Sequence, residues 1–240
     1  TRELLSAEFG VDLRSKSDSQ IAEAAIKARV AKLKGENIYK PEIAPGTVYR
    51  YTPPAWVKFE TPALRAKLAE ICAAPFVVKV DGKVAMPPCL EGAEVQIGAS
   101  LLRMGVGGLH SSESCQGVVP TGGQVLRDTD VVSYYPALIL LCGLFPKNMG
   151  DLFQHVYREF FTRRIHAKKS GHKSTAQTLK IVLNGSFGKL GSKYSVLYSP
   201  DLMIQVTVTG QLALLMLIER LEAIGVRVVS ANTDGIVQLC

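Results

Sequence analysis

The last forty or so residues constrain the fold most, because they join a long helical pattern to a tight turn. Residues 200–223 follow an apolar helical pattern. Two β-rich runs, 226–231 and 236–240, flank the turn residues Asn232-Thr233-Asp234-Gly235. The sequence therefore predicts a helix followed by a β-hairpin that carries Asp234 in its turn.

Periodicity and breaker residues predict further elements upstream. In chain order they are a polar helical region at 1–45, a short helix at 64–73, a β-hairpin at 76–86 around Asp81-Gly82, a strand at 95–102, a strand ending near Val132, an apolar segment at 136–144, and helices at 151–169 and 174–183.

Composition limits the class of protein. The 240 residues are 47% hydrophobic, which is enough for one large core or two small ones. The net charge of +7 favours polyanionic partners, although a charge that serves only solubility explains it equally well. The longest apolar stretch, 212–218, is short of the roughly 20 residues that span a bilayer, so we expect a soluble protein.

The cysteines are scattered and include no C-x-x-C pair, which argues against a disulfide framework and a zinc site and favours a reducing compartment. They are Cys72, Cys89, Cys115, Cys142 and Cys240.

Two aspartates are candidate metal ligands. Asp130 lies where a strand gives way to Ser133-Tyr134-Tyr135-Pro136, and Asp234 lies in the predicted hairpin turn. Carboxylates at strand ends and hairpin tips can converge, and Mg²⁺ is usually bound by one or two carboxylates together with substrate phosphates. Taken alone, each aspartate is more often an ordinary turn or strand-end residue.

A one-sign basic segment lies between the two aspartates. No acidic residue occurs from Phe160 to Pro200, and such a segment repels itself unless an anion relieves it. Arg164 and Lys168 are four apart on one helix face, as are Lys180 and Asn184 on the next. Two such helices could hold a triphosphate, and a general basic surface for nucleic acid is the alternative.

Three segments, in the same order along the chain, resemble the motifs of family B DNA polymerases. The residues in and around them look like those of a bacteriophage branch of that family. Residues 130–136 resemble D-x-x-S-L-Y-P, residues 180–188 resemble K-x-x-x-N-S-x-Y-G, and residues 232–235 resemble D-T-D-S. Upstream, the glycine cluster 105–108 looks like the Y-x-G-G element. The resemblance is specific over about residues 100–240.

The resemblance implies an α+β fold, with a polymerase palm (an antiparallel sheet backed by helices) and a short two-helix fingers hairpin. It implies an N-terminal region at 1–95, palm at 96–150 and 191–240, and fingers at 151–190, with the thumb and exonuclease outside this chain. The expected activity is template-directed DNA synthesis from dNTPs on a primer 3′-hydroxyl, with two Mg²⁺ ions, for which Mn²⁺ can substitute. The expected partners are primer–template DNA and viral replisome proteins in the host cytoplasm, and no membrane.

The resemblance also assigns roles, residue by residue. Asp130, the Val131 carbonyl and Asp234 would bind the metals, and Tyr135 would exclude a 2′-hydroxyl as a steric gate. The expected dNTP-binding residues are Ser133, Tyr134, Tyr135, Arg164, Lys168, Lys180 and Asn184, and the expected DNA-binding residues are Gly107, Gly108, Phe187, Gly188 and Lys189.

Five positions depart from the family's motifs. Asn232 replaces a carboxylate, Gly235 and Gly185 each replace a serine, and Phe187 and Gly105 each replace a tyrosine. We expect activity to survive the change at 232, and we expect the change at 187 to affect fidelity.

Three other interpretations stay open. A reverse transcriptase-like palm would suit Asp130 and Tyr135 but lacks a Y-x-D-D hairpin. A non-catalytic DNA-binding module descended from a polymerase would explain Asn232 as decay. A Rossmann-type nucleotide site at the glycine cluster lacks the G-x-G-x-x-G spacing.

Overall fold

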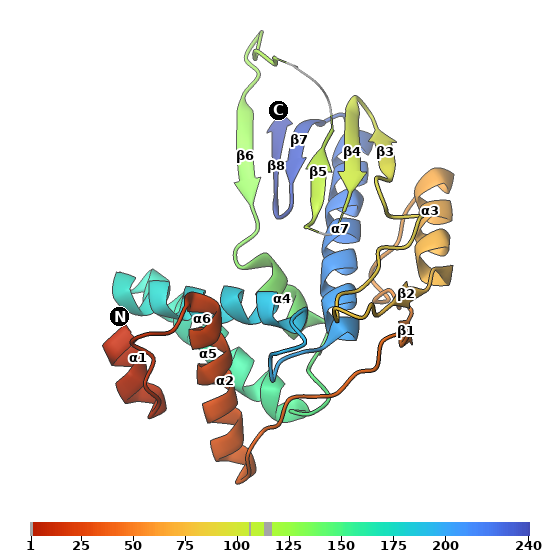
Figure 1. Ribbon diagram of the computed structural model, residues 1–240. Coiled ribbons are helices and arrows are strands. Elements are labelled where there is room, and N and C mark those ends of the chain that lie inside the picture. Colours follow the sequence, from red (N-terminus) through yellow and green to blue (C-terminus); the bar gives the residue numbers. More distant parts are fainter. Residues whose placement is uncertain (1, 106, 113–116) are drawn as a thin grey trace. The chain divides into compact units, whose positions relative to one another are not determined.

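The chain is a mixed α+β protein in which an antiparallel sheet is backed by helices (Figure 1). The computed structural model describes residues 2–105, 107–112 and 117–240. These residues form two units that interleave in sequence. The helical unit comprises Thr1–Thr47, Val78–Val84 and Tyr135–Met203, and the sheet unit comprises Val48–Val77, Ala85–Tyr134 and Ile204–Cys240.

The sheet unit contains a six-stranded sheet in the order β3-β4-β5-β7-β8-β6, with every neighbouring pair antiparallel. Its strands are β3 (Glu94–Ile97), β4 (Ser100–Met104), β5 (Leu109–Ser111), β6 (Leu126–Asp130), β7 (Arg227–Asn232) and β8 (Gly235–Leu239). The short strands β1 (Val48–Tyr49) and β2 (Phe76–Val77) pair separately, and α3 spans Pro62–Ala73. Helix α7 (Pro200–Ala223) runs along one face of the sheet in Figure 1.

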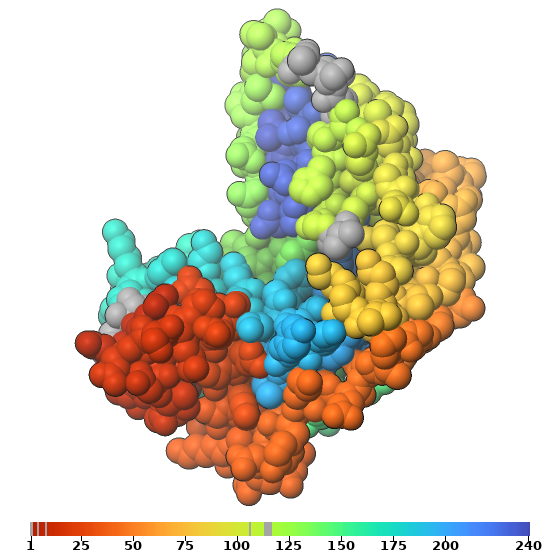
Figure 2. Space-filling view, in the orientation of Figure 1, coloured from red at the N-terminus to blue at the C-terminus, as the bar shows by residue number. Residues whose placement is uncertain are grey.

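Side chains alternate between the two faces of this sheet, as the pleat requires. Ala231 and Ile236 lie opposite each other in the register, and both are buried. Asn232 and Gly235 form the next pair, so they belong to the other face, which we call the outer face. In Figure 2 green to blue strands form the surface of the sheet that is turned to the viewer.

Helix α7 is apolar because it supplies the core of the sheet unit. Among the described helices it alone is long and apolar enough to cross a membrane, but 67% of its most apolar window is buried inside the protein. Leu212, Leu215 and Ile218 are among its buried residues. This burial is typical of the core helix of a globular protein. Its length and apolar composition alone are therefore weak evidence of a membrane span.

One buried carboxylate joins α7 to the start of α3. Glu219 accepts hydrogen bonds from the backbone N–H groups of Glu60 (3.0 Å) and Thr61 (2.8 Å) and from the Thr61 hydroxyl (2.7 Å). Burial raises the pKa of Glu219, but these hydrogen bonds outweigh burial and hold the pKa below its ordinary value. The carboxylate therefore satisfies donors at the N-terminus of α3, where negative charge is favoured.

The helical unit is built on a three-helix packing of α2 (Asp18–Lys34), α5 (Asp151–Lys169) and α6 (Lys173–Leu190). Ser17 and Gln20 form a capping box that starts α2. Glu23 of α2 forms an ion pair with Lys189 (3.1 Å) and accepts a hydrogen bond from the Val196 N–H (2.7 Å). The unit also includes α1 (Arg2–Phe9) and all but the first residue of α4 (Tyr134–Leu141).

Gly185 explains why α2 and α6 can approach closely. A Cβ atom at Gly185 would lie 2.9 Å from the Ala22 Cβ and 3.1 Å from the Asp18 carbonyl oxygen. Such distances are too short for a side chain without movement of α2. The packing of α2 against α6 therefore requires glycine at position 185, where the family motif has serine.

Several sequence predictions are confirmed. The structure contains the predicted helices at 151–169 and 200–223 and the predicted hairpin across 232–235, and α3 begins two residues before the predicted position. The apolar segment at 136–144 is largely the helix α4. Residues 1–45 contain α1 and α2 followed by irregular chain.

Three predicted elements need correction. The strand predicted at 95–102 is two strands, because Gly98 takes a positive φ of 54° and turns the chain between β3 and β4. The hairpin predicted at 76–86 keeps its turn and one bridge, Val78 to Val84, but β2 pairs with β1. Helix α6 continues to Leu190 instead of ending at 183, because Gly185 serves the contact with α2.

We predict that Glu219→Gln lowers the free energy of unfolding of the chain by about 1–3 kcal/mol, because the amide nitrogen would face the backbone N–H donor of either Glu60 or Thr61. Since the folded pKa of Glu219 is depressed, its contribution exists at neutral pH and is lost as the pH falls below the unfolded value. Chemical denaturation of both proteins between pH 7 and pH 3 should show that the difference between their free energies of unfolding becomes smaller as the pH falls. A difference in the free energy of unfolding that does not change with pH would contradict the prediction.

Candidate active site

The β7–β8 hairpin closes with a two-residue turn, Thr233-Asp234, between the paired residues Asn232 and Gly235. Thr233 has a φ of 55°, which a β-branched residue rarely adopts. The turn is held because the Asp234 N–H donates to the Asn232 carbonyl (2.6 Å) and the Thr233 N–H donates to the Leu109 carbonyl (2.7 Å). Asp234 is exposed at this turn.

Strand β6 brings Asp130 beside the same turn. Asp130 lies opposite Gly235 in the β6–β8 register, and the Val131 N–H donates to the Asp234 carbonyl at 2.8 Å. The structure thus places the backbones of Asp130, Val131 and Asp234 side by side, and both aspartates are exposed. Their role as metal ligands stays a prediction.

Gly235 leaves room for the Asp130 carboxylate. A Cβ atom at Gly235 would lie 2.0 Å from Oδ1 of Asp130 and 3.2 Å from the Thr129 carbonyl oxygen. The Asp130 side chain therefore lies over the position that a larger residue would fill. The departure from the motif's serine at 235 has a direct structural reason.

The register extends this position into a polar row across the outer face. Asn232 lies opposite Gly235, and His110, Arg103 and Glu94 follow in successive strands. Asn232, His110, Arg103 and Glu94 are all exposed, and Arg103 forms an ion pair with Glu94 at 2.6 Å. The candidate metal centre therefore continues into a surface of polar side chains.

Gly108 of the glycine cluster packs against the hairpin turn. Gly108 is buried with a φ of 143°, and a Cβ atom there would lie 2.8 Å from the Thr233 hydroxyl oxygen. Gly107 is exposed, and Val106 lies outside the described residues, as does Cys115. Gly108 thus supports the turn, and the DNA-binding role of both glycines stays a prediction.

Asp130 and Asp234 offer carboxylate oxygens, the type of ligand that Mg²⁺ prefers. Among the described residues no group of three or more His, Cys, Asp or Glu side chains could hold a metal. Mg²⁺ does not need such a group, because it commonly takes one or two carboxylates and completes its shell with water and substrate phosphates.

Ser133 and Tyr134 follow β6 in the sheet unit. Ser133 has a φ of 54°, and its buried Oγ has no hydrogen-bond partner among the described residues. Tyr134 is buried and its hydroxyl donates to the Gly210 carbonyl at 2.6 Å. The Tyr134 side chain therefore has a structural contact, and the role of Tyr134 at the triphosphate stays a prediction.

In the helical unit, Tyr135 stacks on Phe187 of α6. Their ring centroids are 4.2 Å apart and the ring planes are inclined by 22°. Two residues that the sequence assigned to the sugar of the nucleotide and to DNA therefore contact each other. The phenylalanine that departs from the motif keeps an aromatic face for this contact.

The predicted phosphate-binding residues lie on α5 and α6. Lys168, Lys180 and Asn184 are exposed. Arg164 is half-buried, its Nη1 has no hydrogen-bond partner among the described residues, and burial lowers its pKa. A buried guanidinium nitrogen without a partner is unfavourable, and an anion would relieve it.

The two remaining DNA-binding candidates on α6 differ. Gly188 is exposed. Lys189 is paired with Glu23, and both side chains are only 19% exposed. The charge of Lys189 is thus already used in fixing α2 to α6.

Sequence reasoning missed residues that act through contacts with distant segments. Gln211 binds the backbone of Gly105, and Glu23 binds Lys189. Neither belongs to a recognised motif. A polar residue within the apolar pattern of α7 was the available signal for Gln211.

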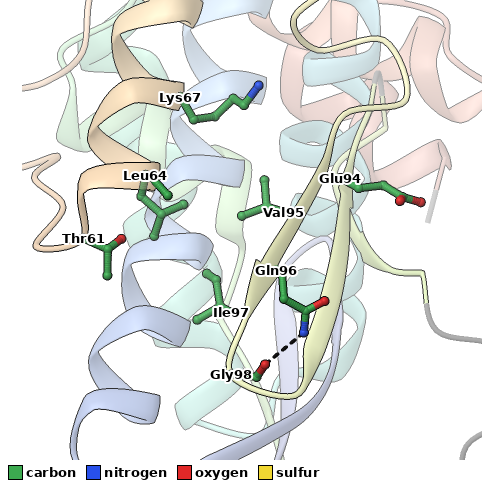
Figure 3. Close-up of a pocket in the computed structure, with 9 residues that line it drawn as sticks. Thr61, Leu64, Lys67, Glu94, Val95, Gln96, Ile97 and Gly98 are labelled. Atoms are coloured by element: carbon green, nitrogen blue, oxygen red, sulfur yellow. Dashed lines mark hydrogen bonds between the residues drawn. The ribbon is translucent and has the colours of Figure 1, made fainter.

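A separate cavity of about 410 Å³ lies between α3 and β3. Figure 3 shows Val95 and Ile97 pointing towards Leu64 of α3, while Glu94 points away. None of the predicted site residues lines this cavity.

Comparisons with known proteins add no family to these observations. No protein-family model matches the chain, and no curated protein matches its sequence.

We predict that Gly235→Ala weakens Mn²⁺ binding by about tenfold or more, because its Cβ would displace the Asp130 carboxylate. Titration with Mn²⁺, followed by water-proton relaxation, measures this affinity. Gly117→Ala is the matched control, since a Cβ there meets no atom within 4 Å. Equal affinity in the two variants would show that Asp130 does not bind the ion.

Proposed function

We propose that the chain carries out template-directed DNA synthesis as a polymerase palm and fingers of the family B type. The observation that carries the proposal is the meeting of two motif aspartates at one hairpin turn. Asp130 lies opposite Gly235, and Val131 is hydrogen-bonded to Asp234. A basic nucleic-acid-binding module has no need for two exposed carboxylates at one place, because they repel a polyanion.

In this proposal Asp130, the Val131 carbonyl and Asp234 hold two Mg²⁺ ions. When bound, these ions acidify the primer 3′-hydroxyl and neutralise charge on the leaving pyrophosphate. The protein's own contribution is to keep both carboxylates in place before substrate arrives. The β6–β8 pairing and the contact of Gly108 with Thr233 support that role.

The helical unit supplies the cations of the proposed mechanism. Arg164, Lys168 and Lys180 would neutralise the phosphates of the incoming dNTP, and Asn184 lies one turn from Lys180 on α6. The unpartnered Nη1 of Arg164 supports this role, because a phosphate oxygen would satisfy it. Tyr135, stacked on Phe187, would lie under the sugar and exclude a 2′-hydroxyl.

We predict that Asp130→Asn and Asp234→Asn each lower primer extension by at least about a thousandfold, since each removes several kcal/mol of charge stabilisation in the transition state. Metal-dependent extension of a labelled primer by the natural protein that contains this chain measures the effect. DNA affinity, measured by fluorescence anisotropy, should not fall, because each change removes a negative charge. Extension at the unmodified rate would refute the proposed function and favour a non-catalytic module.

We predict that Tyr135→Ala raises ribonucleotide incorporation relative to deoxyribonucleotide incorporation by at least about tenfold, because the ring that occupies the space of a 2′-hydroxyl is removed. Primer extension with matched rNTP and dNTP pairs measures the ratio. Tyr194→Ala is the control, since Tyr194 is a tyrosine of the same unit that is 80% exposed. Sugar discrimination equal to that of the control would exclude Tyr135 as the gate.

A further inference from the structure

Gln211 is a buried polar side chain in the middle of the apolar helix α7. It is 2% exposed, and its amide binds both backbone groups of one residue, Gly105. The Gly105 N–H donates to Oε1 at 3.0 Å, and Nε2 donates to the Gly105 carbonyl at 2.9 Å. Strand β4 ends at Met104, so the Gln211 amide takes the place of a neighbouring strand for the next residue.

The segment that Gln211 holds leads directly to the hairpin turn. Gly108, three positions after Gly105, packs against the Thr233 side chain, and its neighbour Leu109 accepts the Thr233 N–H at 2.7 Å. Thr233 precedes Asp234 in the turn. A Cβ atom at Gly105 would lie 3.9 Å from the Gly108 carbonyl oxygen, and Met104, which precedes Gly105, pairs with Leu109. The position of Gly105 therefore influences the support on which Asp234 is presented.

We propose that Gln211 is a positioning residue for the candidate metal centre. Its amide fixes Gly105 beside Gly108, and Gly108 and Leu109 in turn hold the Thr233-Asp234 turn beside Asp130. Without the amide, the part-buried N–H and carbonyl of Gly105 would lose these partners, and Gly105 would shift to satisfy them elsewhere. This inference rests on the proposed function in one respect, because it takes Asp234 as a metal ligand.

The test compares Gln211→Met with the unmodified chain. Methionine has a similar length and volume but cannot pair with the Gly105 backbone. We expect Mn²⁺ affinity, measured by water-proton relaxation, to fall by about tenfold. We also expect the Thr233 amide to exchange with solvent faster in hydrogen-exchange NMR, because its hydrogen bond to Leu109 opens more often. Unchanged affinity and unchanged exchange would overturn the proposal.

Gln205→Met is the matched control on the same helix. The Gln205 amide pairs with both backbone groups of Thr52, donating to the carbonyl at 2.9 Å and accepting the N–H at 3.1 Å, so its loss removes a matched pair of hydrogen bonds elsewhere in the sheet unit. It should leave both Mn²⁺ affinity and Thr233 exchange unchanged. If both variants weaken Mn²⁺ binding equally, the effect is general destabilisation and the positioning role is refuted.

Two further variants keep the result decisive. If Gln211→Met does not fold, Gln211→Glu replaces it, because the carboxylate still accepts the Gly105 N–H but cannot donate to its carbonyl. An affinity between those of the unmodified chain and Asp130→Asn is expected, and unmodified affinity would overturn the proposal. If Asp130→Asn itself leaves Mn²⁺ binding unchanged, the proposed metal centre fails, whereas Thr233 exchange still decides whether Gln211 positions the turn.

Discussion

The register of strand β6 against the β7–β8 hairpin is the constraint on which the candidate site depends. Asp130 lies opposite Gly235, which lies opposite Asn232, so three strands contribute to one point on the outer face. Five residue pairs define this register, from Leu126–Leu239 to Asp130–Gly235, and the Val131 N–H extends it by donating to the Asp234 carbonyl at 2.8 Å. Every residue of β6 is exposed, so backbone pairing, and not burial of side chains, holds the strand in place. Side chains alternate with a period of two, so a slip of one residue in β6 would move Asp130 away from the face that it shares with Asn232.

Sequence reasoning found the elements whose signals are local. The turn residues 232–235 specify a hairpin by their own chemistry, and the apolar pattern of 200–223 specifies a helix. It failed where a distant segment decides the outcome. Residues 95–102 alternate like one strand, but Gly98 takes a positive φ and packs against Glu222 of the distant helix α7, where a Cβ atom would lie 2.2 Å from Oε2. Gly185 and Gly188 suggest a helix end, but α6 continues because α2 packs at Gly185.

The same division applies to the candidate site. Asp130 and Asp234 could be identified from the sequence motifs, because the ability of a carboxylate to bind a metal depends on the residue type. Gln211 could not, since its contribution is a pair of hydrogen bonds to Gly105, whose identity no local pattern reveals. The ion pair of Lys189 is another contact of this kind. The resemblance assigns Lys189 to DNA, a role that stays a prediction, and the structure pairs its charge with Glu23 of a helix that precedes it by more than a hundred positions.

The departures from the family motifs bear on whether the site is intact or decayed. A decayed site accumulates changes without regard to neighbouring atoms, whereas a maintained one accepts only changes that its surroundings accommodate. Gly235 leaves the space that the Asp130 carboxylate occupies, and Gly185 leaves the space that Ala22 occupies. Phe187 keeps a ring that stacks on Tyr135. Each of these three replacements is matched to a contact across the fold, as expected if the proposed site is intact. Asn232 is consistent with that interpretation, because its side-chain amide still places a carbonyl oxygen on the outer face beside Gly235.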